Sequence, residues 1–337
     1  EMGALYAHVE ANRKVKQYAE RLLKKPDALK LFSYTEPEGT EIQRTAGAAW
    51  FHKMGLHTDS QHIILAAGGQ NALAATVLGI LDQGERIGTD YVTYPGIKTI
   101  AQMIGVQLVA IQHKDFEMTE EGIYYAIQNE NIKGIYVIPD FHNPTSHIMS
   151  LETRKMIAQI AQEENILIIE DAINNLLEDN PLPPIAAFAP EQVICLASLS
   201  KTIAPGLRTA FIYVPEKYHC NLATTLYSMN ISNPALLSTI SADLIINGIA
   251  DEIIMERKKE ISNRNLIVND ILNGYLVESK LTCPIRYLLL PDYFTGKSFE
   301  ICALQAGVQV FGAERFTVGN KPAEKAARIS VITPSTI

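Results

Sequence analysis

The chain has 337 residues, of which 47% are hydrophobic and 20% charged, and its formal net charge is −8 at pH 7. This length predicts one large domain with a smaller one beside it, and the composition is ordinary for a soluble globular protein. The negative net charge argues against a chain that binds nucleic acid. No apolar run reaches the roughly 18 residues of a membrane span. The charged start of the chain argues against a secretion signal.

The N-terminal part of the chain predicts two helices joined by a loop. Apolar residues at helical spacing predict a helix over residues 5–30, which Pro26 breaks. A loop over 34–39 precedes a second helix over 40–54, which ends near Gly55.

From residue 62 onward, short apolar segments alternate with helical ones. Strands are predicted at 62–66, 86–88, 106–111, 134–138, 166–170, 193–196 and 211–214. Helices are predicted between them over 70–82, from the Tyr94-Pro95-Gly96 turn to about 104, and over 119–129 and 151–164. Because the strands are continuous apolar runs separated by helices, they predict a mostly parallel sheet covered on both faces, and therefore a large α/β domain.

The pattern changes after residue 235. A helical stretch runs to about 273, followed by a strand at 286–290, a helix over 298–306 and strands near 308 and at 328–332. This order favours a smaller α+β domain attached through a long helix. We therefore expect three parts: an N-terminal segment over 1–33 that packs with the small domain, a large domain over 34–245, and a small domain over 246–337.

The strongest chemical signal is the segment Ser198-Leu199-Ser200-Lys201-Thr202-Ile203-Ala204-Pro205-Gly206-Leu207-Arg208, directly after the strand at 193–196. A lysine just past the carboxyl end of a strand lies where open α/β sheets bind ligands, and its amine can form a Schiff base with an aldehyde cofactor. The hydroxyls of Ser198 and Ser200 and the guanidinium of Arg208 could bind a phosphate group. The alternative is a surface lysine in a loop rich in serine, proline and glycine.

The arrangement Ser-x-Ser-Lys followed by Pro-Gly-Leu-Arg resembles the lysine signature of the fold-type-I, class I and II aminotransferases, which use pyridoxal 5′-phosphate (PLP). Within that family the chain is most similar to the α-aminoadipate, aromatic and kynurenine-type aminotransferases and to the effector domains of MocR-type transcription regulators. The resemblance extends from about Tyr34 to Arg328. It implies a large domain with a mostly parallel sheet, a smaller α+β domain, and PLP bound to Lys201.

Two further motifs, in the order the family requires, imply contacts to the cofactor phosphate and ring. The turn Ala67-Gly68-Gly69-Gln70 would cradle the phosphate at a helix N-terminus, beside Ser198, Ser200 and Arg208. In the stretch Asp90–Gly96, Tyr94 would stack on the pyridine ring. Taken singly, the first motif is also a plain strand–helix turn, and the second contains a turn tyrosine without a ligand.

Two polar residues at strand ends complete the implied contacts to the cofactor. Asp171 would pair with the ring nitrogen and keep it protonated, which makes the ring a better electron sink. In Phe141-His142-Asn143-Pro144-Thr145, which resembles the family's Asn-Pro-Thr-Gly, Asn143 would bind the phenolic oxygen and help to orient the substrate carboxylate. The alternatives are a helix N-cap for Asp171 and a common Asn-Pro turn.

Two residues near the ends of the segment that resembles the family imply how the substrate is bound and how two subunits associate. Arg328, in Ala327-Arg328-Ile329-Ser330, would bind the substrate carboxylate with both arms of its guanidinium, and an edge-strand surface arginine is the alternative. Tyr34 matches a tyrosine that reaches the phosphate in the neighbouring subunit. The resemblance therefore implies a homodimer with shared active sites.

The chain departs from the family pattern at five positions. Val92 replaces a proline, His142 stands where glutamine is more usual, and Ser146 replaces a glycine. Ile173 and Asn174 stand where the family places a tyrosine that donates to the phenolic oxygen of PLP. The loss of this donor should alter the pKa of the Schiff base and puts efficient transamination in doubt.

The cysteines show no pattern of their own. Cys195, Cys220, Cys283 and Cys302 lie far apart, and no cysteine or histidine spacing typical of a metal site is present. This favours reduced thiols in a cytoplasmic protein without a metal.

The resemblance implies an aminotransferase that moves an amino group between an α-amino acid and a 2-oxo acid, with Lys201 and Asp171 as its catalytic residues. A second hypothesis is the PLP-binding effector domain of a MocR-type regulator with little turnover, and a third is another PLP reaction. The missing tyrosine favours the second, whereas the acidic charge and the lack of a winged-helix segment favour the first. A start at Glu1 is also compatible with further chain upstream.

Overall fold

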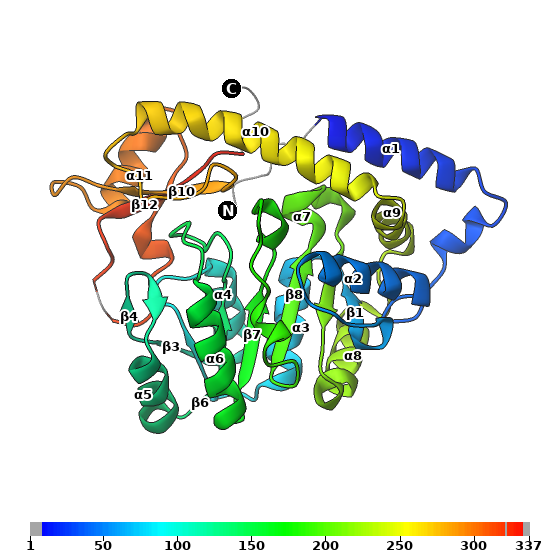
Figure 1. Cartoon of the computed structure of the whole chain (residues 1–337), viewed down its shortest axis with the longest axis horizontal. Coiled ribbons are helices and arrows are strands. Elements are labelled where there is room, and N and C mark those ends of the chain that lie inside the picture. The colour runs from blue at the N-terminus through cyan, green and yellow to red at the C-terminus, as the bar shows by residue number, and fades with distance from the viewer. Residues whose placement is uncertain (1–8, 321, 333–337) are drawn as a thin grey trace.

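The computed structural model describes residues 9–320 and 322–332 and contains a large sheet with helices on both faces and a smaller sheet at one end (Figure 1). The strands of the large sheet are β1 (Ile63–Ala66), β2 (Arg86–Thr89), β3 (Gln107–Ala110), β6 (Ile132–Val137), β7 (Leu167–Asp171), β8 (Val193–Ser198) and β9 (Ala210–Tyr213). Their order is β1-β9-β8-β7-β6-β2-β3, and only β9 pairs antiparallel with its neighbours. The predicted mostly parallel sheet is confirmed.

Both faces of this sheet are buried. In β1, for example, Ile63 and Leu65 face one core, and Ile64 faces the other. One face is covered by α3 (Gly69–Ile80), α4 (Pro95–Ile104) and α8 (Glu216–Asn230), and the other by α2 (Glu41–Lys53), α5 (Glu120–Glu130), α6 (Leu151–Glu163) and α9 (Ala235–Ile246). This two-sided burial explains why the strands are apolar without alternation.

The smaller domain lies at the end of the long helix α10 (Ile249–Ile271), which passes over the large domain (Figure 1). Its sheet has the order β10-β12-β11, formed by β10 (Ile285–Leu289), β12 (Ala326–Ser330) and β11 (Phe311–Gly312), with α11 (Gly296–Gln305) packed against it. These elements agree with the predicted strands and helix. The proposed boundaries at 33/34 and 245/246 stay predictions.

Several elements differ from those predicted. The first helix is α1 (Val9–Leu23), and a 3₁₀ turn over Ala28–Phe32 follows it, while residues 5–8 lie outside the described residues. The long helical stretch after 235 is two helices, α9 and α10, because the chain turns at Gly248, whose φ of +74° favours glycine. The hairpin of β4 (His113–Lys114) and β5 (Glu117–Met118) and the helix α8 were not predicted.

Short helical turns complete the chain. They are α7 (Leu199–Thr202) and the 3₁₀ turns Ser60–His62, Asn175–Leu177, Ile185–Ala187, Pro205–Leu207 and Ala313–Arg315. Within the described part of the chain, no helix combines the length and the apolar character needed to cross a membrane.

Candidate active site

A cavity of about 230 Å³ lies at the carboxyl ends of β6, β7 and β8, where the small domain closes it from above. Open parallel sheets bind ligands at this edge, because the chain leaves adjacent strands there in loops that face the same space. Nine of the residues predicted from sequence line the cavity: Gly69, Gln70, Tyr94, Asn143, Asp171, Ser200, Lys201, Arg208 and Arg328.

Lys201 enters the cavity from the short helix α7, which begins directly after β8. The hydroxyl of Ser198 caps this helix by accepting the backbone N–H of Ser200 at 3.2 Å. Burial lowers the pKa of Lys201 to about 8, and the charge of Arg328 acts in the same direction while Asp171 opposes it. A large fraction of this amine is therefore neutral near pH 8, the form that acts as a nucleophile or base.

Asp171 ends β7 beside the lysine and faces the ring of Tyr136. The hydroxyl of Tyr136, which is fully buried on β6, donates to Asp171 Oδ2 at 3.0 Å. Burial raises the pKa of Asp171 to about 6, against the lowering effect of this hydrogen bond and of Lys201. The alternative of a helix N-cap does not hold, because Asn174 precedes the next helical turn.

At the start of α3, hydrogen-bond donors surround a space that could hold a phosphate group. The N-terminal N–H groups of α3 begin at Gly69, and Ser198 and Ser200 lie opposite, with their hydroxyls 3.1 Å apart. The guanidinium of Arg208 lies over Gly68, where a Cβ atom would come within 2.4 Å of Arg208 Nη2. Gly68 also has a φ of +96°, so both its backbone and its neighbour require glycine.

Tyr94 forms one wall of the cavity. Its hydroxyl donates to Gln70 Oε1 at 2.9 Å, which fixes the ring beside the start of α3. Burial raises the pKa of Tyr94 to about 12, and the charge of Asp171 adds to this rise, so the hydroxyl stays protonated at neutral pH. The ring is therefore available as a neutral stacking surface.

Arg328 and Asn143 meet on the side of the cavity that the small domain provides. Arg328 donates from Nη1 to Asn143 Oδ1 at 3.1 Å, and its guanidinium packs over the rings of Phe311 and Phe316 at 4.8 and 5.2 Å. Burial lowers its pKa to about 10. Within residues 9–320 and 322–332 no carboxylate pairs with this buried cation, and its Nε has no hydrogen-bond partner, so a ligand carboxylate would satisfy it.

Two positions where the family places a tyrosine also line the cavity. Ile173 contributes an apolar wall, and Asn174 donates from Nδ2 to the carbonyl of Phe141 at 3.3 Å. The carbonyl oxygen of the Asn174 side chain is buried without a hydrogen-bond partner. The side chain at this position thus fixes the loop of Phe141 and presents no hydroxyl.

Three predicted residues lie off the lining. Ser198 is buried just behind Ser200, and Gly68 lies beneath Arg208. Tyr34 is 80% exposed on the surface of the chain, so its role in a neighbouring subunit stays a prediction.

The sequence did not predict the apolar wall from the small domain or the tyrosine behind Asp171. The wall consists of Pro284, Ile285 and Ile332. No sequence motif distinguishes these residues from other apolar residues in strands and loops. They reach the cavity only because the two domains pack together. Tyr136 carries a weak signal, because it is the one polar ring in a mostly apolar, buried strand.

The lining residues suit two ligands that bind side by side, a cofactor and a smaller second molecule. An amine with a lowered pKa, a carboxylate at a strand end, a flat ring and a group of phosphate donors fit a phosphorylated aromatic aldehyde with a ring nitrogen. The guanidinium of Arg328, which has no carboxylate partner in the described part of the chain, lies beside the amide of Asn143 and fits the carboxylate of a small second molecule. The donor set, and above all the buried Arg328 without a carboxylate, therefore supports a cofactor site next to a substrate site.

Comparisons with known proteins agree with this geometry. The family profile "Aminotransferase class I and II" matches residues 6–337. The uncharacterized HTH-type transcriptional regulator YdeF of Bacillus subtilis is 42% identical over all of this chain, which covers 73% of that protein. The uncharacterized HTH-type regulator YdfD of the same organism is 24% identical over 74% of this chain, which spans only about half, 52%, of its length.

Among solved structures, the chain is similar to the α-aminoadipate aminotransferase LysN of Thermus thermophilus, which was solved with N-(5′-phosphopyridoxyl)-L-leucine. The TM-score is 0.86 at 21% sequence identity, over 98% of this chain and 86% of LysN. A likeness at this identity shows the fold, and it confirms the predicted fold class.

Proposed function

Because this chain belongs to the class I and II aminotransferase family, whose cofactor is pyridoxal 5′-phosphate, we propose that it moves an amino group between an α-amino acid and a 2-oxo acid. The observation that carries the proposal is the meeting of three groups in one cavity. The amine of Lys201 and the carboxylate of Asp171 come from the large domain. The guanidinium of Arg328, which pairs with no carboxylate of the described residues, comes from the small domain.

The residues that would hold the cofactor fall into two groups. Gly68, Gly69, Gln70, Ser198, Ser200 and Arg208 would bind its phosphate. Asp171 would bind the ring nitrogen, Tyr94 would stack on the ring, and Asn143 would bind the phenolic oxygen. The hydrogen bond from Tyr136 supports this role of Asp171, because it orients the carboxylate at the edge of the cavity.

When bound, the cofactor supplies an aldehyde for a covalent bond to an amine and a ring that accepts electrons from the substrate's α-carbon. Lys201 Nζ would remove the proton from that carbon in its neutral form and return it at the next position. Arg328 and Asn143 would hold the substrate carboxylate and so orient the α-carbon toward Lys201. The apolar wall of Pro284, Ile285 and Ile332 would exclude water.

We further propose that the protein acts as a cytoplasmic homodimer with shared sites. The largely exposed ring of Tyr34 supports this, as does the run of exposed apolar side chains next to it, which includes Leu29 and Phe32 at 81% and 70% exposure. A partner that covers this face would bring Tyr34 close to the second protomer.

The lowered pKa of Lys201 predicts the pH dependence of PLP capture. The pKa falls from 10.5 to about 8, so the neutral fraction rises roughly tenfold per pH unit up to about pH 8 and then levels off. The rate of covalent PLP binding to the apoprotein should follow this curve, measured by stopped-flow absorbance from pH 6 to 10. A free lysine derivative should keep accelerating over the whole range. A protein profile that also rises to pH 10 would contradict the lowered pKa.

The second candidate function is a PLP-binding effector domain of a MocR-type regulator with little turnover. The relation to YdeF supports it, because this chain covers 73% of a protein named as an HTH-type regulator. Asn174 and Ile173 in place of the family's tyrosine support slow chemistry as well. Both candidates require PLP at Lys201 and differ in turnover.

A half-reaction screen separates the two candidates. The PLP-loaded protein should be yellow, and each amino acid in turn should convert its absorption band to that of the pyridoxamine form. An aminotransferase should respond within minutes to at least one amino acid and reverse with a 2-oxo acid. A protein that is yellow but unchanged by every amino acid favours the effector domain. A protein that stays colourless with added PLP contradicts both.

A further inference from the structure

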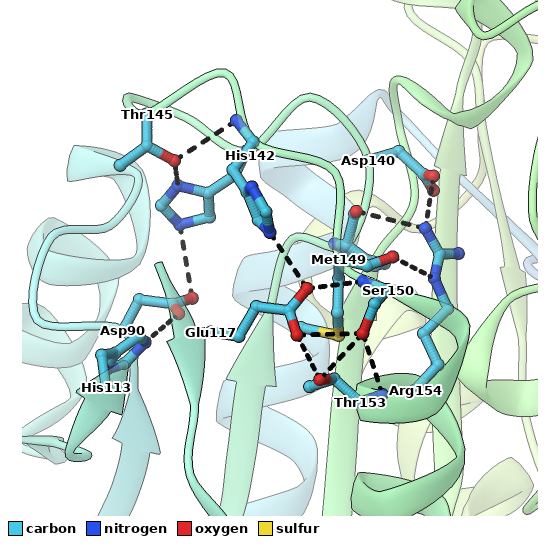
Figure 2. A network of polar contacts seen from close by, with 12 residues as sticks. Asp90, His113, Glu117, Asp140, His142, Thr145, Met149, Ser150, Thr153 and Arg154 are labelled. Carbon is cyan, nitrogen blue, oxygen red and sulfur yellow. Dashed lines mark hydrogen bonds and ion pairs between the residues drawn. The ribbon is translucent and has the colours of Figure 1, made fainter. Parts of the chain in front are cut away.

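The loop that carries Asn143 runs from β6 to α6, over residues 138–150, and three carboxylates contact it, two of them buried and one partly buried (Figure 2). Asp90 faces its first half, Glu117 its second half, and Asp140 lies within it and binds Arg154. None of the three has a part in the function proposed above, and Asp90 is the one that contacts the residue next to Asn143. Its two partners are histidines that no predicted role accounts for.

Asp90 lies directly after β2, between the rings of His113 and His142, as Figure 2 shows. His113 Nε2 lies 2.5 Å from Asp90 Oδ1, and His142 Nε2 lies 3.3 Å from Asp90 Oδ2. All three side chains are at least nine-tenths buried. Although burial alone would raise it, the two imidazoles hold the pKa of Asp90 well below its usual range.

The ring of His113 is held at both of its nitrogens. Nδ1 lies 2.8 Å from the carbonyl oxygen of Ile111, and Nε2 lies 2.5 Å from Asp90 Oδ1, so each nitrogen faces an oxygen acceptor. His142 Nδ1 lies 2.8 Å from the hydroxyl of Thr145, which can donate to it. His142 Nε2 faces Asp90 Oδ2 as an ion-pair contact, and neither of these two buried atoms has a hydrogen-bond partner among the described residues.

His142 is fixed through its backbone as well as its ring. Its N–H donates to the carbonyl of His147 at 2.8 Å, and its own carbonyl accepts the N–H of Ser146 at 2.7 Å. Asn143 is the next residue in this closed turn. Its Oδ1 accepts from Arg328, which leaves the amide N–H groups free to donate into the cavity.

We propose that His142, anchored by the Asp90–His113 ion pair, is a positioning residue that holds Asn143 in the orientation that binds the substrate carboxylate. The inference rests on the proposed function, because it concerns the same cavity. His142 touches neither cofactor nor substrate and acts through the adjacent residue. A variant that loses the contact between His142 and Asp90 should bind the substrate carboxylate more weakly. Its affinity for the cofactor phosphate should stay unchanged.

Two probes separate these effects. Pyridoxamine 5′-phosphate reports binding of the phosphate and ring, and N-(5′-phosphopyridoxyl)-L-leucine adds a carboxylate. We define the carboxylate gain as the ratio of their affinities, measured by calorimetry on the apoprotein. His142→Leu should reduce this gain about tenfold, the effect of one hydrogen bond to a charged group, and change pyridoxamine phosphate affinity less than about threefold.

Two further variants test the positioning role. His142→Gln restores an N–H donor toward Asp90 and should recover the gain to within about threefold of wild type. His147→Leu is the matched control: its ring also contacts a carboxylate, the partly buried Glu117, at 3.0 Å, but it lies away from the turn position next to Asn143. This control should lower thermal stability and leave the gain unchanged. If His142→Leu does not fold, Asp90→Asn should show the same loss.

The outcomes are distinct. If the wild-type protein binds neither probe, the proposed function is contradicted. If it binds both probes with equal affinity, Arg328 and Asn143 do not bind the substrate carboxylate. An unchanged gain in His142→Leu, an equal loss in His142→Leu and His147→Leu, or no rescue by His142→Gln overturns the positioning role. A selective loss with rescue supports it.

Discussion

Lys201→Ala should bind PLP without a covalent bond and should lose amino transfer by a factor of roughly 10²–10⁴ or more, the usual contribution of a positioned acid–base group. The reason is that Lys201 Nζ is the amine in the cavity whose pKa, near 8, allows a neutral form at working pH. After borohydride reduction of the PLP-loaded protein, mass spectrometry should find the pyridoxyl label on the peptide with Lys201. The variant should carry no label.

Lys98 provides a matched control for this experiment. Burial lowers the pKa of Lys98 as well, but its amine donates to the carbonyls of Arg315 and Thr317, away from the cavity. Lys98→Ala should therefore keep the label and the activity. A label on any lysine other than Lys201 in wild-type protein would show that the site is wrong.

The parts of the site that could be predicted are those encoded within a few residues of a strand end. The apolar run Leu167–Ile169 indicates a buried parallel strand, and the acidic pair that follows it, Glu170-Asp171, is expected at the ligand edge of the sheet. In the structure Asp171, the last residue of the strand, lines the cavity, whereas Glu170 is buried and accepts from the backbone N–H of Ile185. The same reasoning predicts the positions of Lys201 and Asn143. In each of these cases the residue ends or follows a strand in the sequence. The end of the strand therefore places it at the ligand edge of the sheet.

The parts that could not be predicted depend on segments that meet only in the folded chain. His113 lies in a two-residue strand of a hairpin too short to leave a periodic pattern, so its approach to Asp90 has no signature in the sequence. The wall of Ile285 and Ile332 depends on how the small domain docks. The break at Gly248 was missed because one glycine in a helical pattern is compatible with both a break and a continuous helix.

One departure from the family shows how the fold accommodates an altered motif. Ser146 stands where the family has glycine, and it adopts a φ of +60°, the left-handed region that favours glycine. The hydrogen bond from its N–H to His142 and the contact of its carbonyl with the hydroxyl of Ser279, at 2.9 Å, hold this conformation. The turn next to Asn143 is thus maintained by contacts from both domains.

The stability of this loop depends on the ion pair between Arg154 and Asp140, both fully buried at 2.7 Å (Figure 2). Arg154 also donates to the carbonyls of Pro139, Met149, Leu182 and Pro183, and Asn175 donates to the second oxygen of Asp140 at 3.0 Å. Arg154→Met would leave a buried carboxylate without its cation and several carbonyls without donors. We expect a loss of about 3–5 kcal/mol in the free energy of unfolding.

Denaturant unfolding of the apoprotein, followed by circular dichroism, measures this loss. Arg315→Met is the control, because Arg315 pairs with Glu300 at a half-exposed site and its loss should cost no more than about 1 kcal/mol. The double variant Asp140→Leu with Arg154→Met removes both charges and should recover part of the stability, since the main penalty is the uncompensated carboxylate. If Arg154→Met and Arg315→Met lose equal stability, the buried pair does not anchor the loop.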